Sequence, residues 1–476
     1  MWEFILQQLN NNPNSIIFDS DRIFTYNEFK NIIASHGENL KKHLPFGAKC
    51  AVLCKSGLNC AISILACWYA NIIPIPMSMN YGEHHCRNIL DFTTPDMLIT
   101  DDEMYPDFNK YNLLSCDFSL CNKQNIYKDN DLEDVAAIMC TSGTTGIPKG
   151  TLITIKGLHE NIIKISKYFD INTNDKIMIA RPLYHCAVFT GEFLVSIFKG
   201  VNIGFFDGKY DPNNILQFAI KEDITVLCGT PTLFNHISGF VKRAKLIHKI
   251  KKIALSGECL NRKTAEIIRG SFPYSDIYNV YGLTEASPRV SFLSPELFDN
   301  FSESVGLPLD GIEIIISDSG NNELPAYSKG MIMIKTPCIM KGYYKNKAAT
   351  DKSIINGWLN TGDYGYKDEN GYLYILSRVD DMIIKGGMNI YPKEIENQVI
   401  SIEVIKECMA YGIKTDIGQE IAIDIVLNTE EKTVSKRDLV GLISDTLPSY
   451  QMPTKINIVN SLKRNASGKL VRSYSK

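Results

Sequence analysis

One short segment, residues 140–150, gathers side chains that are suited to hold a chain of phosphates. It reads Cys-Thr-Ser-Gly-Thr-Thr-Gly-Ile-Pro-Lys-Gly. Glycine lets backbone N–H groups converge on an anion, because no Cβ obstructs the approach. Hydroxyls donate hydrogen bonds to phosphate oxygens, and a lysine adds positive charge. The segment predicts a phosphate-binding loop, although a lone Gly-rich turn is more often structural. The residues concerned are Thr141, Ser142, Gly143, Thr144, Thr145 and Lys149.

The spacing within this loop separates it from the loop of P-loop kinases. That loop has the pattern GxxxxGK[ST], in which the lysine directly follows the second glycine. Here Ile147 and Pro148 stand between Gly146 and Lys149. The apolar run 137–139 before the loop predicts the buried strand that such a loop should follow. The pattern therefore disfavours a P-loop enzyme and favours another nucleotide-binding class.

Four further segments accompany the loop, in a fixed order along the chain. Residues 279–285 read Asn-Val-Tyr-Gly-Leu-Thr-Glu, and residues 358–363 read Trp-Leu-Asn-Thr-Gly-Asp. Residues 377–381 read Ser-Arg-Val-Asp-Asp, with Ile-Lys-Gly-Gly at 384–387, and residues 465–469 read Asn-Ala-Ser-Gly-Lys. Together these elements resemble the adenylate-forming superfamily of acyl- and aryl-CoA synthetases, peptide-synthetase adenylation domains and luciferases. The resemblance covers essentially the whole chain.

The resemblance implies roles for the residues that handle ATP. The loop would hold the β- and γ-phosphates, Glu285 would ligate Mg²⁺, and Thr284 would contact the α-phosphate. Lys469 would be the catalytic lysine, which bridges the α-phosphate and the carboxylate of the acid. Outside this context Glu285 would equally suit the start of a helix, and Lys469 would be an ordinary surface lysine.

The resemblance also implies a nucleoside site. Asp363 would accept both ribose hydroxyls, and Arg378 would hold ribose or phosphate. Tyr281 would stack on adenine, and Asn279 would accept a hydrogen bond from its amino group. Alone, Asp363 would be a turn residue and Arg378 a surface ion pair. The predicted adenine site comprises Gly257, Glu258, Asn279, Tyr281 and Gly282.

A hinge between two half-reactions is implied in the same way. Asp380 occupies the family's hinge position. Rotation of a C-terminal domain about it would remove Lys469 and bring in the loop of Lys385, Gly386 and Gly387, beside which a pantetheine arm would pass.

The acid pocket is the least defined part of the prediction. His185, in Pro-Leu-Tyr-His at 182–185, resembles a residue that flanks the reacting carboxylate, whereas a lone histidine is more often structural. Adenylation domains that activate amino acids place an aspartate after this motif. Residues 187–192 contain none, and an unpaired ammonium is costly to bury. We therefore expect an aryl or aliphatic acid rather than an α-amino acid. The predicted pocket residues are Cys186, Phe189, Cys228, Ser256, Ala286 and Ser287.

The elements that must position these residues alternate between strand and helix. Residues 49–54, 72–76, 177–180, 201–206, 225–228 and 252–255 predict buried strands, and residues 28–44 and 58–70 predict helices between them. Such alternation indicates a doubly wound α/β fold. Residues 311–375 predict a small β subdomain, and the chain from 381 a compact α+β domain. We expect an N-terminal AMP-binding domain at 1–379, a hinge at 380 and a mobile C-terminal domain at 381–476.

Bulk composition excludes several other classes. The chain has 476 residues and a net charge of −3, so it has no electrostatic reason to bind nucleic acid. No stretch is long and apolar enough to predict a membrane span, and the N-terminus does not resemble a signal peptide. The 13 cysteines show no metal or redox spacing, which indicates reduced thiols in a cytoplasmic protein. We expect a monomer or a homodimer.

Three functions remain open. The first is ATP- and Mg²⁺-dependent activation of a small carboxylic acid, with transfer to the thiol of CoA. The second is the same adenylation followed by transfer to the phosphopantetheine of an acyl carrier protein. The third is a scaffold that binds nucleotide without catalysis, which the intact set of reactive residues disfavours.

Overall fold

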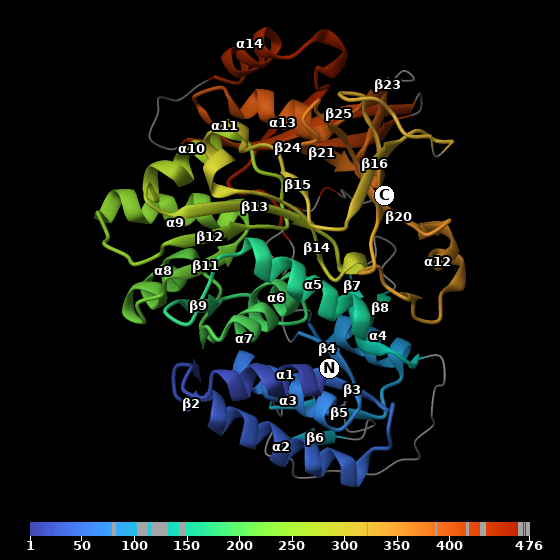
Figure 1. Ribbon diagram of the computed structural model, residues 1–476. Coiled ribbons are helices and arrows are strands. Elements are labelled where there is room, and N and C mark those ends of the chain that lie inside the picture. Colours follow the sequence, from blue (N-terminus) through green and yellow to red (C-terminus); the bar gives the residue numbers. More distant parts are fainter. Residues whose placement is uncertain are drawn as a thin grey trace.

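The computed structural model describes residues 1–78, 82–101, 113–115, 132–141, 148–320, 322–385, 388–415, 418–428, 435–464, 470 and 472. A large N-terminal domain, blue through yellow to the light orange of α12 in Figure 1, carries a smaller C-terminal domain, darker orange to red, at one end. Both domains combine helices and sheets, so the predicted α/β class is confirmed.

The largest sheet of the N-terminal domain has nine strands in the order β15-β14-β13-β12-β11-β9-β10-β1-β2. Six neighbouring strands run parallel to one another, namely β13, β12, β11, β9, β10 and β1. At the two edges, β2, β14 and β15 each pair antiparallel with a neighbour. Their bounds are β1 Ile16–Phe18, β2 Ile23–Thr25, β9 Lys176–Ile179, β10 Asn202–Phe205, β11 Val226–Gly229, β12 Lys252–Leu255, β13 Asp276–Gly282, β14 Arg289–Leu293 and β15 Leu307–Pro308.

Both faces of this sheet are covered, which explains why its strands are apolar at almost every position. Along β11, Val226 and Cys228 belong to one hydrophobic core, and Leu227 between them belongs to another. The second core is completed by α8 (Pro212–Lys221), α9 (Pro231–Ala244) and α10 (Arg262–Ser271). The first core faces α5 (Ile155–Tyr168), the short helix α6 (Cys186–Val188) and the π-helix η4 (Phe189–Leu194).

Two smaller sheets complete the lower part of the N-terminal domain in Figure 1. A parallel sheet has the order β4-β3-β5-β6, and a three-stranded sheet has the order β18-β8-β7. Their bounds are β3 Lys49–Leu53, β4 Ile73–Pro76, β5 Met97–Thr100, β6 Leu113–Ser115, β7 Val135–Thr141, β8 Lys149–Thr154 and β18 Gly342–Tyr343.

Several of the helices around these sheets begin at side-chain caps. Thr25 and Glu28 form a reciprocal capping box at α2, and the Thr154 hydroxyl accepts from Gly157 at α5. The remaining bounds are α1 Trp2–Asn11, α2 Tyr26–His43, α3 Gly57–Tyr69, α4 Glu83–Thr93, α7 Val195–Lys199, η5 Thr284–Ala286, η6 Pro295–Leu297, α11 Phe298–Phe301 and α12 Lys347–Ser353.

A β subdomain joins the large sheet to the C-terminal domain. Its strands are β16 Glu313–Ser317, β17 Gly330–Lys335, β19 Ile354–Ile355, β20 Trp358–Lys367 and β21 Leu373–Arg378. β20 and β21 are antiparallel, and their register places Asp363 opposite Arg378. This register brings together two residues that the sequence analysis assigned to one nucleoside site.

The C-terminal domain has hydrophobic clusters of its own, built from residues between Ile383 and Leu470. Its three-stranded sheet has the order β24-β25-β26, with α13 and α14 beside it at the top of Figure 1. The bounds are η7 Val379–Asp381, β22 Ile383–Lys385, β23 Met388–Ile390, α13 Pro392–Ile400, β24 Ile405–Thr415, β25 Gly418–Leu427, α14 Lys436–Thr446, η8 Ser449–Gln451 and β26 Lys455–Ile458.

The predicted strands and helices are confirmed, with ends that differ by one or two residues. Within the described ranges no helix is long and apolar enough to cross a membrane. The cysteines of those ranges are all free, and only Cys259 among them is more than slightly exposed.

Candidate active site

The candidate site lies where the parallel strands of the large sheet end. Cys228 stands near the carboxyl end of β11, Ser256 follows β12 directly, and Gly282 is the exposed last residue of β13. Because these neighbouring strands are parallel, their carboxyl ends meet at one edge of the sheet, the usual place for ligands in such folds.

The predicted ribose site is assembled by the hairpin of β20 and β21. The Arg378 guanidinium donates to Asp363 Oδ1 at 2.9 Å and to the Thr361 carbonyl at 3.0 Å. The Tyr281 hydroxyl donates to Asp363 Oδ2 at 2.5 Å. Gly362 has φ +71°, and a Cβ there would lie 2.8 Å from the Arg378 guanidinium, so glycine leaves room for this pair. The structure thus brings three predicted residues together, with each Asp363 oxygen oriented by one donor.

Asn279 lies two residues before Tyr281 on the same face of β13, and its side chain is almost fully buried. Both amide hydrogens are engaged, because Nδ2 donates to the carbonyls of Ser302 and Ser304 at 3.1 and 2.9 Å. Only Oδ1 is left to meet a ligand. An acceptor is what the predicted contact with the adenine amino group requires.

Glu258 has a different environment from the one expected of an adenine contact. Its Oε2 accepts from the Thr232 N–H at 3.2 Å, at the start of α9, and its Oε1 accepts from Arg464 of the C-terminal domain at 3.3 Å. The carboxylate therefore joins the two domains. Beside it, Gly257 has φ +87° in the turn after β12 and presents backbone to the site.

Glu285, the predicted magnesium ligand, lies in the 3₁₀-helix η5 together with Thr284. Tyr343 donates its hydroxyl to Glu285 Oε1 at 2.8 Å. This leaves Oε2 without a partner among the described residues. The described chain holds no group of three or more His, Cys, Asp or Glu side chains suited to a metal ion. One oriented carboxylate fits Mg²⁺, which is often held by one or two carboxylates and by phosphate oxygens.

The ends of the predicted phosphate loop lie close to Glu285. β7 and β8 pair with Thr141 opposite Lys149. The Lys149 Nζ lies 5.4 Å from the ring centroid of Tyr343, the residue that orients Glu285. Several predicted residues lie outside the described residues, namely Ser142, Gly143, Thr144, Thr145, Gly386, Gly387 and Lys469, together with the side chain of Thr141.

His185 ends the segment that follows β9 and precedes α6. Burial and the nearby charge of Arg181 lower the pKa of His185 to about 3, so the ring is uncharged at neutral pH. Its Nε2 has no hydrogen-bond partner. An uncharged imidazole with an unsatisfied nitrogen suits a residue that flanks a substrate, as predicted.

The structure supports part of the predicted pocket wall. Cys186 and Cys228 are both buried within electrostatic reach of Arg289, and burial raises the pKa of the Cys186 thiol to about 12. The Ser256 hydroxyl accepts from Arg181 at 3.2 Å. These three side chains therefore surround one small region beside η4.

Three other predicted wall residues have partners within the protein. The Phe189 ring packs at 5.6 Å from the ring of Trp68 within the first core. The Ser287 hydroxyl donates to the Cys338 carbonyl at 2.9 Å, and Ala286 is fully buried, with its carbonyl facing Asn161. As lining residues of the acid pocket, these three stay a prediction.

Charged residues that were not predicted from the sequence also lie in this region. The Arg181 guanidinium donates to Glu192 Oε1 at 2.5 Å, and both side chains are buried. Arg289, at the start of β14, is also buried. The signal was a charged residue inside an otherwise apolar strand, directly after a segment already assigned to the pocket.

Comparisons with known proteins agree with this geometry. The family model described as AMP-binding enzyme matches residues 5–344, and the model described as AMP-binding enzyme C-terminal domain matches residues 394–469. The chain belongs to the AMP-binding enzyme family. The predicted membership of the adenylate-forming superfamily is thereby confirmed, as is the predicted class of enzyme, an AMP-forming acid–thiol ligase.

Some relatives of this AMP-binding enzyme match it over nearly its whole length. The 2-succinylbenzoate–CoA ligase of Bacillus subtilis is 28% identical over 100% of this chain and 97% of its own. The solved o-succinylbenzoate CoA synthetase of Bacillus subtilis with its acyl-adenylate intermediate OSB-AMP has a TM-score of 0.86 at 26% identity, covering 98% and 96% of the two chains. A double mutant of that synthetase with the product analogue OSB-NCoA, at the same identity and coverage, has a TM-score of 0.71.

Direct contacts join the two domains of this AMP-binding enzyme. Arg464 bonds to Glu258 across the boundary and to Glu407 within its own domain. The Lys393 Nζ donates to the Cys259 carbonyl at 3.1 Å, and Lys329 forms an ion pair with Glu394. Lys385 is held inside the C-terminal domain by Glu420 at 2.8 Å. Asp380, in η7, is exposed and forms no hydrogen bond or ion pair with the described residues.

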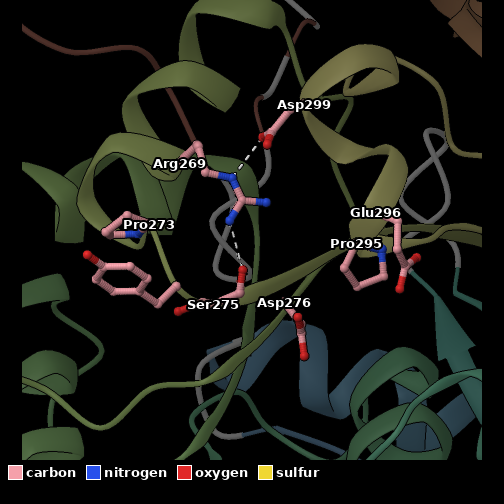
Figure 2. Close-up of a pocket in the computed structure, with 8 residues that line it drawn as sticks. Arg269, Pro273, Ser275, Asp276, Pro295, Glu296 and Asp299 are labelled. Carbon is pink, nitrogen blue, oxygen red and sulfur yellow. Dashed lines mark hydrogen bonds and ion pairs between the residues drawn. The ribbon is translucent and has the colours of Figure 1, made fainter.

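A separate hollow, shown in Figure 2, does not belong to this site. It has a volume of about 270 Å³ and lies at the amino end of β13, beside Asp276, whereas the candidate site lies at the carboxyl end. Arg269 crosses it to bond Asp299 and the Ser275 carbonyl, both at 2.8 Å. Its one arginine is already paired with Asp299, so we assign it no ligand.

Proposed function

We propose that the protein uses ATP and Mg²⁺ to convert a carboxylic acid into an acyl-AMP, with release of pyrophosphate. The acyl group then passes to the thiol of CoA. The main support is that Tyr281, Asp363 and Arg378 lie together with Glu285 at one edge of the sheet. The chain also superposes along its length on a relative solved with an acyl-adenylate. CoA is favoured over a carrier protein because relatives that match most of the chain are named CoA ligases.

The first half-reaction brings two anions together, so the site must supply positive charge and positioning. Asp363, held by Arg378 and Tyr281, fixes the ribose and thereby the α-phosphate. Glu285 would hold Mg²⁺, which supplies neutralising charge to the leaving pyrophosphate. Thr284 and Lys469 stay proposed contacts of the α-phosphate, and uncharged His185 flanks the incoming carboxylate without adding a titrating charge.

The acid proposed is an aryl acid rather than an α-amino acid. An α-ammonium needs a free carboxylate in the pocket. Glu192 is the one acidic residue of the segment 187–192, and its charge is already neutralised by Arg181 at 2.5 Å. An ammonium would therefore be buried without a partner, at high cost.

Two domain orientations would serve the two half-reactions, with Asp380 as the proposed hinge between residues 1–379 and 381–476. The present orientation is closer to the adenylate complex of the relative than to its product-analogue complex, with TM-scores of 0.86 and 0.71. The contact of Arg464 with Glu258 belongs to this orientation. In it Lys385 bonds within its own domain, as expected of a loop reserved for the thioester step.

The free, largely buried cysteines support a reducing compartment, and we therefore propose a cytoplasmic enzyme. That the protein is a monomer or a homodimer stays a prediction.

The test is acid-dependent exchange of pyrophosphate into ATP across a panel of aryl, aliphatic and amino acids, followed by addition of CoA or a holo-carrier protein. We expect exchange with an aryl acid and the appearance of its CoA thioester. Absence of exchange with every acid would refute the proposed chemistry. If the carrier protein is acylated and no CoA thioester forms, the acceptor of the acyl group is the carrier protein and not CoA.

A further inference from the structure

A strongly basic segment joins the end of α9 to the start of β12. Residues 242–252 contain six lysine or arginine residues and no aspartate or glutamate. The net charge of −3 for the whole chain conceals this local excess. We call residues 242–251 the basic loop, and its exposed cations are Lys242, Arg243, Lys245, Lys249 and Lys251.

Every second residue anchors the basic loop to the protein. Leu246 and Ile250 pack into the second core, and the His248 ring lies 4.8 Å from the ring of Phe272. The residues that alternate with these anchors are all exposed, namely Lys245, Ile247, Lys249 and Lys251. Because its neighbours on both sides are held inside, Ile247 is kept outside, where it is 89% exposed.

A second apolar tip stands on the neighbouring loop, before β13. Tyr274 is 96% exposed, and Tyr274 and Ile247 are the two most exposed large apolar or aromatic side chains of the described residues. The Ser275 hydroxyl donates to the Ile250 carbonyl at 2.8 Å, and Arg269 donates to the Ser275 carbonyl at 2.8 Å (Figure 2). These bonds fix the turn that carries Tyr274 beside the basic loop. Single exposed apolar residues are ordinary, but two fixed tips on adjacent loops form a patch.

The protein leaves most of the positive charge of the basic loop unbalanced. Lys249 forms an ion pair with Asp223 at 2.9 Å, and both side chains are more than half exposed. The other four exposed cations form no ion pair with a carboxylate of the described residues. Burial lowers the pKa of His248, so this ring adds no charge at neutral pH. The surface around Ile247 is therefore positive and attracts anions.

The acids of this end of the sheet lie around the hollow of Figure 2 rather than in the basic loop. Asp276, Glu296 and Asp299 line that hollow, where Arg269 pairs with Asp299. Tyr274 lines it as well, so it stands where the positive surface borders the hollow.

The make-up of the patch favours a lipid surface over other polyanions. An isoleucine at the centre of a positive surface gains nothing from the phosphates of a nucleic acid, whereas it leaves water when it enters the interface of a bilayer. Four of the five exposed cations are lysines. Lysine acts as a point charge and suits a diffuse negative surface, whereas bidentate recognition of a single phosphate favours arginine. Anionic phospholipids supply the charge and the apolar depth together.

We propose that the basic loop, with Ile247 and Tyr274 as its apolar tips, docks the enzyme on an anionic phospholipid surface. The tips enter the headgroup region, and the lysines approach the lipid phosphates. The basic loop and the turn of Tyr274 precede β12 and β13, whereas the candidate active site lies at the carboxyl ends of these strands. Docking at this end therefore leaves the active site open. The inference goes beyond the proposed function and does not depend on it.

The test is flotation of the full chain with vesicles of phosphatidylcholine alone and of phosphatidylcholine mixed with phosphatidylglycerol, at low and high salt. Two variants alter the patch: Ile247→Asn, and a triple variant with Lys245→Gln, Lys249→Gln and Lys251→Gln. Two matched controls make the same changes elsewhere. Ile23→Asn replaces an exposed isoleucine on β2, and a second triple variant replaces three scattered, exposed lysines by glutamine, namely Lys42, Lys156 and Lys352.

We expect the wild type to float with the mixed vesicles and not with phosphatidylcholine alone, and high salt should release it. Binding should weaken about tenfold in Ile247→Asn, the scale of partly burying an aliphatic side chain. It should weaken about 100-fold in the triple variant of the basic loop, at about fivefold for each lysine. Both controls should bind within about threefold of the wild type, because the overall charge of the second triple variant is the same. Melting temperatures and vesicle-free pyrophosphate exchange, measured for every variant, should match the wild type.

Three results would overturn the assignment. The first is a wild-type protein that does not float with anionic vesicles at low salt. The second is equal weakening in the patch variants and their controls, which would make binding a matter of overall charge. The third is binding to heparin that is as tight as binding to the mixed vesicles and unaffected by Ile247→Asn, which would show a general polyanion site. Loss of pyrophosphate exchange in the wild type would refute the proposed function and leave the lipid result standing.

Discussion

Replacement of Asp380 by proline tests whether this residue is the hinge between the half-reactions. In the present orientation Asp380 lies in the 3₁₀-helix η7, where φ is about −50° to −70°. Proline fixes φ near −65°, so its ring suits this backbone. The Asp380 N–H donates to no carbonyl of the described residues, so its loss removes no hydrogen bond. The variant should fold normally and keep the present orientation.

The magnitudes follow from these observations. A compatible proline stabilises a fold by about 0.4–1 kcal/mol, offset in part by the restriction that it places on Val379. The free energy of unfolding should thus change by less than about 1 kcal/mol. An orientation that needs another φ at this residue would be disfavoured by about 3 kcal/mol or more, which exceeds a 100-fold change.

The assay separates the half-reactions. Pyrophosphate release with ATP and acid should stay within about threefold of the wild type, whereas conversion of supplied acyl-AMP to acyl-CoA should fall at least about 100-fold. Asp380→Ala is the matched control, because it removes the charge and leaves the backbone free. Since Asp380 forms no ion pair with the described residues, and Arg378 pairs with Asp363 instead, the alanine variant should be nearly normal. Similar losses in both variants, spread over both steps, would refute the hinge.

Four further predictions concern the chemistry. Arg464→Gln should slow adenylation about fivefold, the scale of about 1 kcal/mol for a partly exposed ion pair, and spare thioester formation from supplied acyl-AMP. Glu285→Gln should lower the adenylation rate about 100-fold and raise the Mg²⁺ concentration needed for half-maximal rate. Lys469→Ala should cripple adenylation and leave thioester formation largely intact in the same two assays. Because burial lowers the pKa of His185 to about 3, the pH–rate profiles of wild type and His185→Asn should show the same acid limb between pH 5.5 and 7.5.

Each of these predictions has an opposing outcome. Equal losses in both half-reactions would exclude a step-specific role for Arg464 or Lys469. An unchanged Mg²⁺ requirement in Glu285→Gln would remove that carboxylate from the metal site. An acid limb near pH 6.5 that disappears in His185→Asn would show that the histidine titrates near its ordinary pKa. The effect of His185 on the free energy of unfolding follows as well. Because its pKa is lower in the folded than in the unfolded protein, it favours folding above about pH 6.5, and this contribution is lost as the pH falls toward 3.

The sequence alone determined the elements and the chemical class. The apolar run of α3 and the strands β3 and β4 are local patterns, because periodic burial leaves its mark on neighbouring residues. The ordered motifs were recognisable for a related reason. A phosphate, a ribose and a metal ion each demand particular side chains at fixed short spacings, whatever the rest of the chain does.

Only the tertiary structure decided which side chains meet. Arg464 and Glu258 are 206 residues apart and bond because two domains with separate cores dock. Phe189, which begins the π-helix η4, packs against Trp68, a residue 121 positions away in the sequence. The buried Arg289 guanidinium lies where it does because Gly191, on another element, leaves space for it. Whether a buried charge is balanced is a property of everything that surrounds it, and no stretch of sequence carries that information.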